Sequence, residues 1–263
     1  MRITQSWLVL LITVLAGCAT SPLGRSQLTL VNDDELNKMG VQAFEDIKKK
    51  TPTSKNAKVN AYVQCVAQAV ASKAKGAHVP SSWEVAVFES DQVNAFALPG
   101  GKIGVYTGLL KVAENQDQLA TVIGHEVGHV IARHGNERMS QAQAADKVKQ
   151  LAGQFAGGGG IVSTAGMGAL GVGLEYGVLL PYGRTQESEA DKIGLDLMAE
   201  SGFDPRESVK LWENMARASG GNKPAELLST HPAETTRISH LNARMPNALK
   251  LAKGVTRTNC AKG

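Results

Sequence analysis

The positions of hydrophobic and polar residues along the chain predict a mainly helical protein. Apolar residues recur every three or four positions in several segments, which is the spacing of one face of a helix. These segments are residues 33–50, 56–75, 115–139, 185–201, 203–219 and 231–245. The first begins with acidic residues and ends with Lys48–Lys50, an order that suits the helix dipole.

Two stretches between the second and third of these segments have a different pattern. Residues 83–90 alternate as a strand does, and residues 94–110 contain two extended pieces separated by Pro99-Gly100-Gly101. The second stretch predicts a hairpin or a pair of strands. Neither an internal repeat nor a second apolar core is evident. We therefore expect a single domain over residues 33–263, mainly α with a small β-sheet (an α+β fold).

The segment 153–183 has an unusual composition, with eleven glycines and almost no charge. Its small residues fit a loosely packed hairpin of helices, a flap over the body of the domain, or a loop that dips into a membrane. Frequent glycine weakens any stable membrane-spanning helix. We therefore favour a flap over this segment.

The N-terminus has the pattern of an export signal. Arg2 precedes an apolar run, Trp7–Ala16, that is shorter than a membrane-spanning helix requires. The run leads into Leu15-Ala16-Gly17-Cys18, which resembles a bacterial lipobox; the alternative is an ordinary signal peptide that contains a cysteine. We expect a signal peptide (residues 1–17), lipidation at Cys18 and a short flexible tether (residues 18–32).

This pattern predicts a protein of the periplasm. Ala19 follows the cysteine where inner-membrane retention would require aspartate, so we expect anchoring to outer-membrane lipid through acylated Cys18. The remaining cysteines, Cys65 and Cys260, are an even pair in an oxidising compartment. We expect a disulfide between them, the alternative being two unrelated buried thiols.

Charge and composition argue against one class of partner. The chain has 28 basic and 24 acidic residues, a formal net charge of +4, and 43% hydrophobic residues, as ordinary globular proteins have. The only basic run, Lys48–Lys50, fits a solvated helix end. We therefore expect no nucleic-acid partner.

The strongest chemical signal is the sequence HEVGH within residues 121–138. His125 and His129 are about one helical turn apart, so a single metal ion can contact both imidazoles. Glu126 is rotated about 100° around the helix from His125 and can instead take a proton from a metal-bound water. The alternative is a pair of surface histidines, but burying such residues in an apolar segment without a metal would be costly.

A catalytic zinc ion needs a third protein ligand. The extended pattern HExxHxxGxxH would supply it, but position 132 is alanine and position 135 is glycine. His134 is one residue out of phase with that pattern. We interpret it as a helix C-terminal or structural residue.

A carboxylate on a later helix is the remaining source of this ligand. Glu187 and Asp191 are four residues apart and share a helix face, so Glu187 can bind zinc while Asp191 supports a histidine ligand or caps a neighbouring backbone group. Glu189 points elsewhere, and we expect it to be solvated. The alternative is that all three are surface charges of the helix.

Several motifs together give a family resemblance. NAFALPGG, HEVGH, the sequence ESEAD that starts at Glu187 and the THP that contains His231 follow one another in this order. The chain thereby resembles the HtpX / CAAX-prenyl-protease family of zinc metallopeptidases (metallopeptidase family 48), and more narrowly its periplasmic lipoprotein branch of BepA and LoiP. The resemblance covers nearly all of the chain after residue 33. It implies a gluzincin-type zincin with a small β-sheet beside the HExxH helix.

The resemblance also implies roles for particular residues. His125, His129 and Glu187 would bind one Zn²⁺ ion per chain, and Glu126 would act as the general base. An edge strand of the active site would pair with an extended substrate. Its residues are Asn94, Ala95, Phe96, Ala97 and Leu98.

Two further residues have open roles. In the family, the position of His231 lies near the zinc ion, where it would donate to the oxyanion or act as a fourth ligand that keeps the enzyme latent; on spacing alone it is a turn residue. Arg237 would help at the oxyanion or form an ordinary salt bridge.

The sequence therefore predicts a zinc endopeptidase that degrades unfolded or misassembled periplasmic and outer-membrane proteins. Such proteins are the partners that the resemblance and the export signal imply. The alternative is a lipid-anchored chaperone or assembly factor whose zinc site is structural or latent. An intact Glu126 argues against a purely structural zinc, because such a site needs no base.

Overall fold

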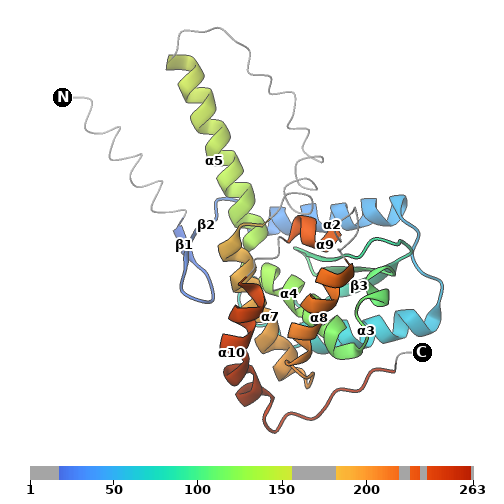
Figure 1. Ribbon diagram of the computed structural model, residues 1–263. Helices are drawn as coiled ribbons and strands as arrows, with labels where there is room; N and C mark the ends of the chain where they lie inside the picture. The colour runs from blue at the N-terminus through green and yellow to red at the C-terminus, as the bar shows by residue number, and fades with distance from the viewer. Residues whose placement is uncertain (1–17, 156–181, 219–225, 232–235, 262–263) are drawn as a thin grey trace.

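Helices form most of the chain, as the apolar spacing predicted (Figure 1). The computed structural model describes residues 18–155, 182–218, 226–231 and 236–261. The expected signal peptide and most of the expected glycine-rich flap lie outside these ranges. Among the described helices, none has both the length and the apolar character needed to cross a membrane.

The first two helices each begin at an asparagine. The side chain of Asn32 accepts hydrogen bonds from two backbone N–H groups at the start of α2 (Asp33–Lys50). Asn56 does the same for α3 (Ala57–Ala71). Acidic residues fill the first turn of α2, and Lys48–Lys50 fill its last turn. Both ends of α2 therefore complement the helix dipole.

Three short strands follow α3. They are β3 (Glu84–Phe88), β4 (Ala95–Leu98) and β5 (Lys102–Tyr106), arranged in the order β3-β5-β4. β5 pairs in parallel with β3 and antiparallel with β4, so the predicted strand pair is a hairpin and β4 is an edge of the sheet. Gly100 and Gly101 form its turn with φ angles of 81° and 73°, which favour glycine.

The sheet separates two apolar clusters. Alternate residues of a strand point to opposite faces, so Ala95 and Ala97 join the main core with α3 and α4 (Gln116–Ile131). Phe96 and Leu98 instead pack in a smaller cluster with α2. The helix that contains HEVGH therefore lies against the edge strand β4.

The segment predicted as one helix over residues 115–139 is in fact two helices. α4 ends at Ile131, and α5 (His134–Phe155) begins after Arg133, whose φ is +56°. Residues other than glycine rarely adopt this left-handed conformation. The Arg133 guanidinium is held by Asp33, with Nη2 2.6 Å from Oδ1. α5 projects away from the body of the molecule (Figure 1).

The remaining helices pack on the other side of α4. α7 (Arg184–Glu200) crosses α4, α10 (Arg237–Ala252) packs on α7, and α8 (Glu207–Ala218) contacts α4 and α10. The short α9 (Glu226–Thr230) precedes His231. α10 continues past the predicted end at residue 245, with Pro246 inside it.

A disulfide joins α3 to the C-terminal segment. A disulfide links Cys65 of α3 to Cys260 near the C-terminus, with Cα atoms 5.8 Å apart. The pairing is the one that the cysteine count suggested. It closes a loop of 195 residues across most of the fold.

The described chain begins with a hairpin where we expected a flexible tether. β1 (Cys18–Thr20) pairs antiparallel with β2 (Ser26–Leu28), and β2 packs beside α5 (Figure 1). Arg25 in the turn lies 2.6 Å from Glu137 and 3.0 Å from Glu189. Ion pairs therefore attach this segment to the domain.

Candidate metal centre

Two glycines let α4 and α7 cross in backbone contact. A Cβ atom on Gly194 would lie 2.6 Å from the backbone nitrogen of His125, and one on Gly124 would lie 2.7 Å from the carbonyl oxygen of Gly194. Real Cβ atoms do not approach so closely, so only glycine permits this crossing. The crossing sets the HEVGH residues of α4 beside Glu187 in the first turn of α7.

Four side chains converge at this crossing. His125, His129, Glu187 and His231 each offer one ligand atom, and these atoms lie within 4.8 Å of one another. All four residues are buried, with at most 4% of their surface exposed. The predicted trio is therefore assembled in the structure, and His231 joins it.

The spacing of the ligand atoms fits a four-coordinate ion. The Nε2 atoms of His125 and His129 are 3.1 Å apart, and each lies 3.4 Å from an oxygen of Glu187. Nδ1 of His231 lies 3.2 Å from His125 Nε2 and 3.0 Å from Glu187 Oε1. Ligand atoms about 2.0–2.1 Å from a tetrahedral ion are about 3.3–3.4 Å from one another. The four side chains could therefore hold a metal ion, and imidazole donors suit a transition metal.

The carboxylates make the site attractive to a cation. Burial disfavours the charged form of His125, but Glu187 and Asp191 overcome this effect and raise its pKa to about 10. Burial also favours the neutral form of Glu187, yet the three surrounding histidines hold the pKa of Glu187 far below its usual range. The carboxylates therefore favour a positive charge at this position, carried either by a proton on His125 or by a metal ion.

Glu126 lies beside this cluster and is not one of its four members. Its Oε1 atom is 3.4 Å from Nε2 of His231 and, within the described part of the chain, has no hydrogen-bond partner. Burial raises the pKa of Glu126, and this is partly opposed by His231 and His125 and by a hydrogen bond from the backbone N–H of Ala97. A buried carboxyl group with a raised pKa is suited to accept a proton and return it.

Asp191 contacts His125 from behind, which is the first of the two roles expected for it. Oδ1 of Asp191 accepts a hydrogen bond from Nδ1 of His125 at 2.8 Å, so Nε2 is directed at the cluster. Arg237 Nε donates to Asp191 at 2.7 Å, and its Nη2 donates to Glu187. The Arg237 guanidinium also lies 4.0 Å from the ring centre of Trp212. These contacts are those of a buried ion pair that positions two carboxylates.

The prediction that Glu189 is solvated is wrong. Only 4% of Glu189 is exposed, and its carboxylate accepts hydrogen bonds from Ser21 and Arg25 of the N-terminal hairpin. Nε2 of His134 lies 3.2 Å from the same carboxylate, and Nδ1 of His134 lies 2.9 Å from Nδ1 of His129. Helix periodicity did not reveal this group, because its members come from distant parts of the chain. The histidine that follows HEVGH was the only available signal.

Tyr182, which the sequence did not single out, covers the cluster. Its ring stacks on His129 and His231, with centroids 3.9 Å and 5.2 Å away. The guanidinium of Arg138 lies 4.1 Å from the same ring. Burial raises the pKa of Tyr182 to about 12, so the phenol is neutral near pH 7.

The free edge of β4 faces the same site. The N–H of Tyr106 donates to the carbonyl of Asn94 at 3.1 Å, so the alternation of an antiparallel pair directs the backbone groups of Ala95 and Ala97 away from β5. The side chain of Asn94 accepts the Ala95 N–H at 2.9 Å, and Glu126 accepts that of Ala97. The five residues expected to contact substrate are at most 9% exposed. A substrate strand can therefore reach this edge only after the covering groups move.

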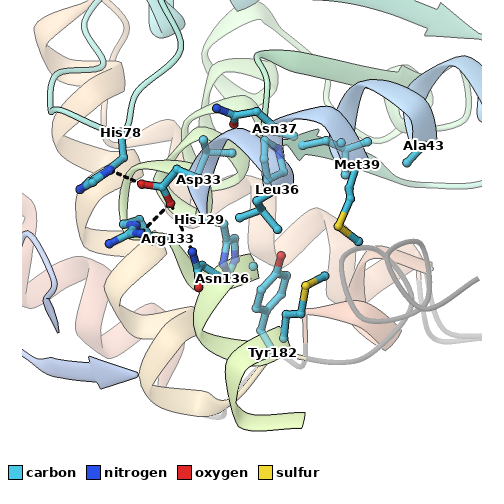
Figure 2. Close-up of a pocket in the computed structure, with 17 residues that line it drawn as sticks. Asp33, Leu36, Asn37, Met39, Ala43, His78, His129, Arg133, Asn136 and Tyr182 are labelled. Carbon is cyan, nitrogen blue, oxygen red and sulfur yellow. Dashed lines mark hydrogen bonds and ion pairs between the residues drawn. The ribbon is translucent and has the colours of Figure 1, made fainter. Parts of the chain in front are cut away.

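A cavity of about 50 Å³ adjoins the cluster. Figure 2 shows His129 and Tyr182 at one side of it and Leu36 and Met39 of α2 at another. Asp33 forms a polar rim, where three neighbouring side chains bond to its carboxylate. The apolar walls suit a hydrophobic side chain close to the metal centre.

Buried imidazole and carboxylate donors beside a proton-accepting glutamate define the site of a metal-dependent hydrolase. Comparison with known protein families specifies the class, because residues 57–245 match peptidase family M48. The chain belongs to this family.

Similar proteins include mitochondrial enzymes of eukaryotes and bacterial proteases. Mitochondrial metalloendopeptidase OMA1 of Schizosaccharomyces pombe is 38% identical over 167 residues, which cover 63% of this chain and 48% of that protein. Metalloprotease LoiP of Escherichia coli is 29% identical over 242 residues, covering 89% of this chain and 92% of that protein. The beta-barrel assembly-enhancing protease of Yersinia pestis is 28% identical over 233 residues, covering 84% and 46%. The chain thus spans about half the length of the OMA1 relative.

Proposed function

We propose that the protein is a zinc endopeptidase that cleaves unfolded or misassembled proteins of the bacterial periplasm and outer membrane. The observation that carries this proposal is the convergence of His125, His129 and Glu187 beside the unbonded carboxylate oxygen of Glu126. Zinc is the ion that we assign, because it favours four-coordinate sites of histidine and carboxylate. When bound, zinc would polarise the scissile carbonyl and lower the pKa of the attacking water.

Glu126 then carries the proton. It accepts one from the attacking water and passes it to the leaving amine, as its raised pKa and its position beside the metal ligands allow. Asp191 and Arg237 keep His125 and Glu187 in place during this transfer. Among these residues, Glu126 is therefore the one whose removal should stop cleavage without removing the metal.

We assign His231 to the fourth metal position in a latent state. Catalytic zinc sites keep one position open for water or substrate, whereas Nδ1 of His231 is as close to Glu187 and His125 as a fourth ligand would be. Tyr182 stacks over the same position. Both side chains must move before a peptide reaches the metal.

The substrate that fits this site is an extended chain. Backbone groups of Ala95 and Ala97 on the outer edge of β4 can pair with a peptide strand, and the cavity beside His129 can take one of its apolar side chains. A folded substrate does not offer a free strand of this kind. The site therefore selects for unfolded protein.

We further propose that Cys18 carries lipid and anchors the enzyme to the outer membrane from the periplasm. The apolar run before Cys18 and its lipobox-like ending support this address. Similarity to LoiP extends over nearly the whole length of that protein. The OMA1 relatives are named mitochondrial, so the assignment depends on the N-terminal sequence.

Cleavage of unfolded casein by the purified full-length chain tests the proposal. We expect the zinc-loaded protein to cleave casein, and both Glu126→Gln and a chelator to abolish cleavage. Glu213→Gln is the matched control, because it makes the same change on an exposed part of α8. The His231→Ala variant is assayed in parallel so that latency does not hide the activity. If neither the wild type nor His231→Ala cleaves better than Glu126→Gln, the protein is a binding factor, such as a lipid-anchored chaperone, and the proposal is wrong.

A further inference from the structure

A continuous series of contacts runs from His129 to the N-terminal hairpin. Nδ1 of His129 lies 2.9 Å from Nδ1 of His134, and Nε2 of His134 lies 3.2 Å from Glu189. Ser21 and Arg25 donate to the two oxygens of the Glu189 carboxylate. All of these residues except Arg25 are buried. The series lies on the opposite side of His129 from the metal position.

The direction of the hydrogen bonds follows from the metal. When Nε2 of His129 faces the ion, its Nδ1 carries the proton and donates it to Nδ1 of His134. His134 must then carry its own proton on Nε2, which points at Glu189. Glu189 can only accept, and it receives three donors. Each hydrogen bond in the series therefore has one donor and one acceptor, and no two donors face each other.

The hairpin fixes the outer end of the series. Arg25 makes a bidentate ion pair with Glu137 of α5, at 2.6 Å and 2.7 Å, in addition to its bond to Glu189. Gln186 of α7 donates to the same Glu137 at 2.7 Å. Arg25 is therefore bonded to two helices, and Glu189 cannot turn away without losing its hydrogen bonds from the Arg25 Nε–H and the Ser21 hydroxyl.

We propose that His134 and Glu189 are positioning residues that hold His129 in its metal-binding orientation, and that the hairpin residues Ser21 and Arg25 complete the support. The proposal depends on the proposed function only in treating His129 as a zinc ligand. It gives the hairpin that begins at Cys18 a part in building the metal centre. His125 has its own support in Asp191 and Arg237, so each histidine ligand has a separate carboxylate behind it.

Zinc affinity of the full-length chain, measured by competition with a chromophoric chelator, tests the proposal. Losing such a support typically costs about 10–100-fold in metal affinity. We expect a loss in this range for His134→Phe, which keeps a ring but has no acceptor, and a smaller loss for Glu189→Gln. His134→Asn places an oxygen where Nδ1 was and should recover part of the affinity. The double variant His134→Phe with Glu189→Gln should lose no more than His134→Phe alone, because both act through one series.

The control is Asp196→Asn. Asp196 also lies on α7, and its ion pair with Arg244 does not contact any candidate metal ligand. Its zinc affinity should equal that of the wild type. The visible spectrum of the cobalt-substituted protein should change in His134→Phe and remain unchanged in Asp196→Asn, which a general loss of stability would not produce. If the His134 and Glu189 variants bind zinc as tightly as the wild type, the support is refuted while the proposed function stands. If the wild type itself fails to bind zinc, the proposed function fails first.

Discussion

Replacing Gly194 by alanine should open the crossing of α4 and α7 and damage the metal site. The added Cβ would lie 2.6 Å from the backbone nitrogen of His125, whereas ordinary contacts begin at 3.4 Å. The two helices must therefore separate by about 0.8 Å, because the nearest atoms, His125 N and the carbonyl group of Gly124, belong to the backbone and cannot rotate away.

The energetic effect has two opposing parts. Alanine is favoured over glycine within a helix by about 1 kcal/mol. Overpacking a core costs about 1–3 kcal/mol, occasionally more, and a contact with rigid backbone belongs at the upper end. We therefore expect Gly194→Ala to lower the free energy of unfolding by about 2 kcal/mol in urea titrations with excess chelator.

Gly194→Ala should also lower zinc affinity, independently of its effect on the free energy of unfolding. His125 lies on α4 and Glu187 on α7, so a separation of about 0.8 Å exceeds the roughly 0.2 Å within which metal–ligand distances are held. We expect zinc affinity to fall at least about tenfold, equivalent to about 1.4 kcal/mol. Chelator competition measures this loss independently of unfolding.

Gly135→Ala is the matched control for this substitution. Gly135 is also helical, but a Cβ at that position would meet no heavy atom within 4 Å. This variant should keep wild-type zinc affinity and gain up to about 1 kcal/mol of stability. If Gly194→Ala behaves like Gly135→Ala in both assays, backbone contact at the crossing does not set the spacing of the ligands.

Three further outcomes follow from the structure. Cys65→Ser should lower the free energy of unfolding by about 2–5 kcal/mol in urea titrations without reductant, and reductant should then have no further effect on the variant. His231→Ala should retain one zinc per chain by elemental analysis and cleave casein faster than the wild type; slower cleavage would instead assign His231 to the oxyanion. Burial raises the pKa of Glu137, but its bonds to Arg25 and a neighbouring amide outweigh this and lower it below 4.5. The stability that Glu137 contributes is therefore present above about pH 4.5 and is lost as the pH falls below that value. The difference in urea midpoint between the wild type and Glu137→Gln should accordingly become smaller towards about pH 3.

The elements of the fold were predictable where a local signal sufficed. Apolar spacing identified α2, α3, α7 and α8 within a few residues, and Pro99-Gly100-Gly101 marked the hairpin of β4 and β5. The break between α4 and α5 was not predictable in this way. It occurs at Arg133, which carries no turn signal and adopts a positive φ beside Asp33, a residue that is distant in sequence.

The candidate site likewise has residues that a local signal predicted and residues that it did not. HEVGH and the candidate third ligand, Glu187, were found because each depends on which face of one helix a residue occupies. The covering by Tyr182 and the bonds of Glu189 depend on tertiary packing. A single sequence shows the helix positions of such residues but not which segments pack against them.

The acidic residues of α7 show why helix periodicity alone predicted only part of the candidate site. Glu187 and Asp191 share a face and both reach the centre, one as a candidate ligand and one behind His125. Glu189 points to another face of α7. The sequence did not show that any segment packs on that face, so solvent was the expected environment. The bend at Arg133 places the start of α5 on that side, and the N-terminal hairpin covers it, so Glu189 is enclosed and supports His129 through His134. A carboxylate on the outer face of a ligand-bearing helix should therefore be assigned to solvent only after the segments that pack against that face are known.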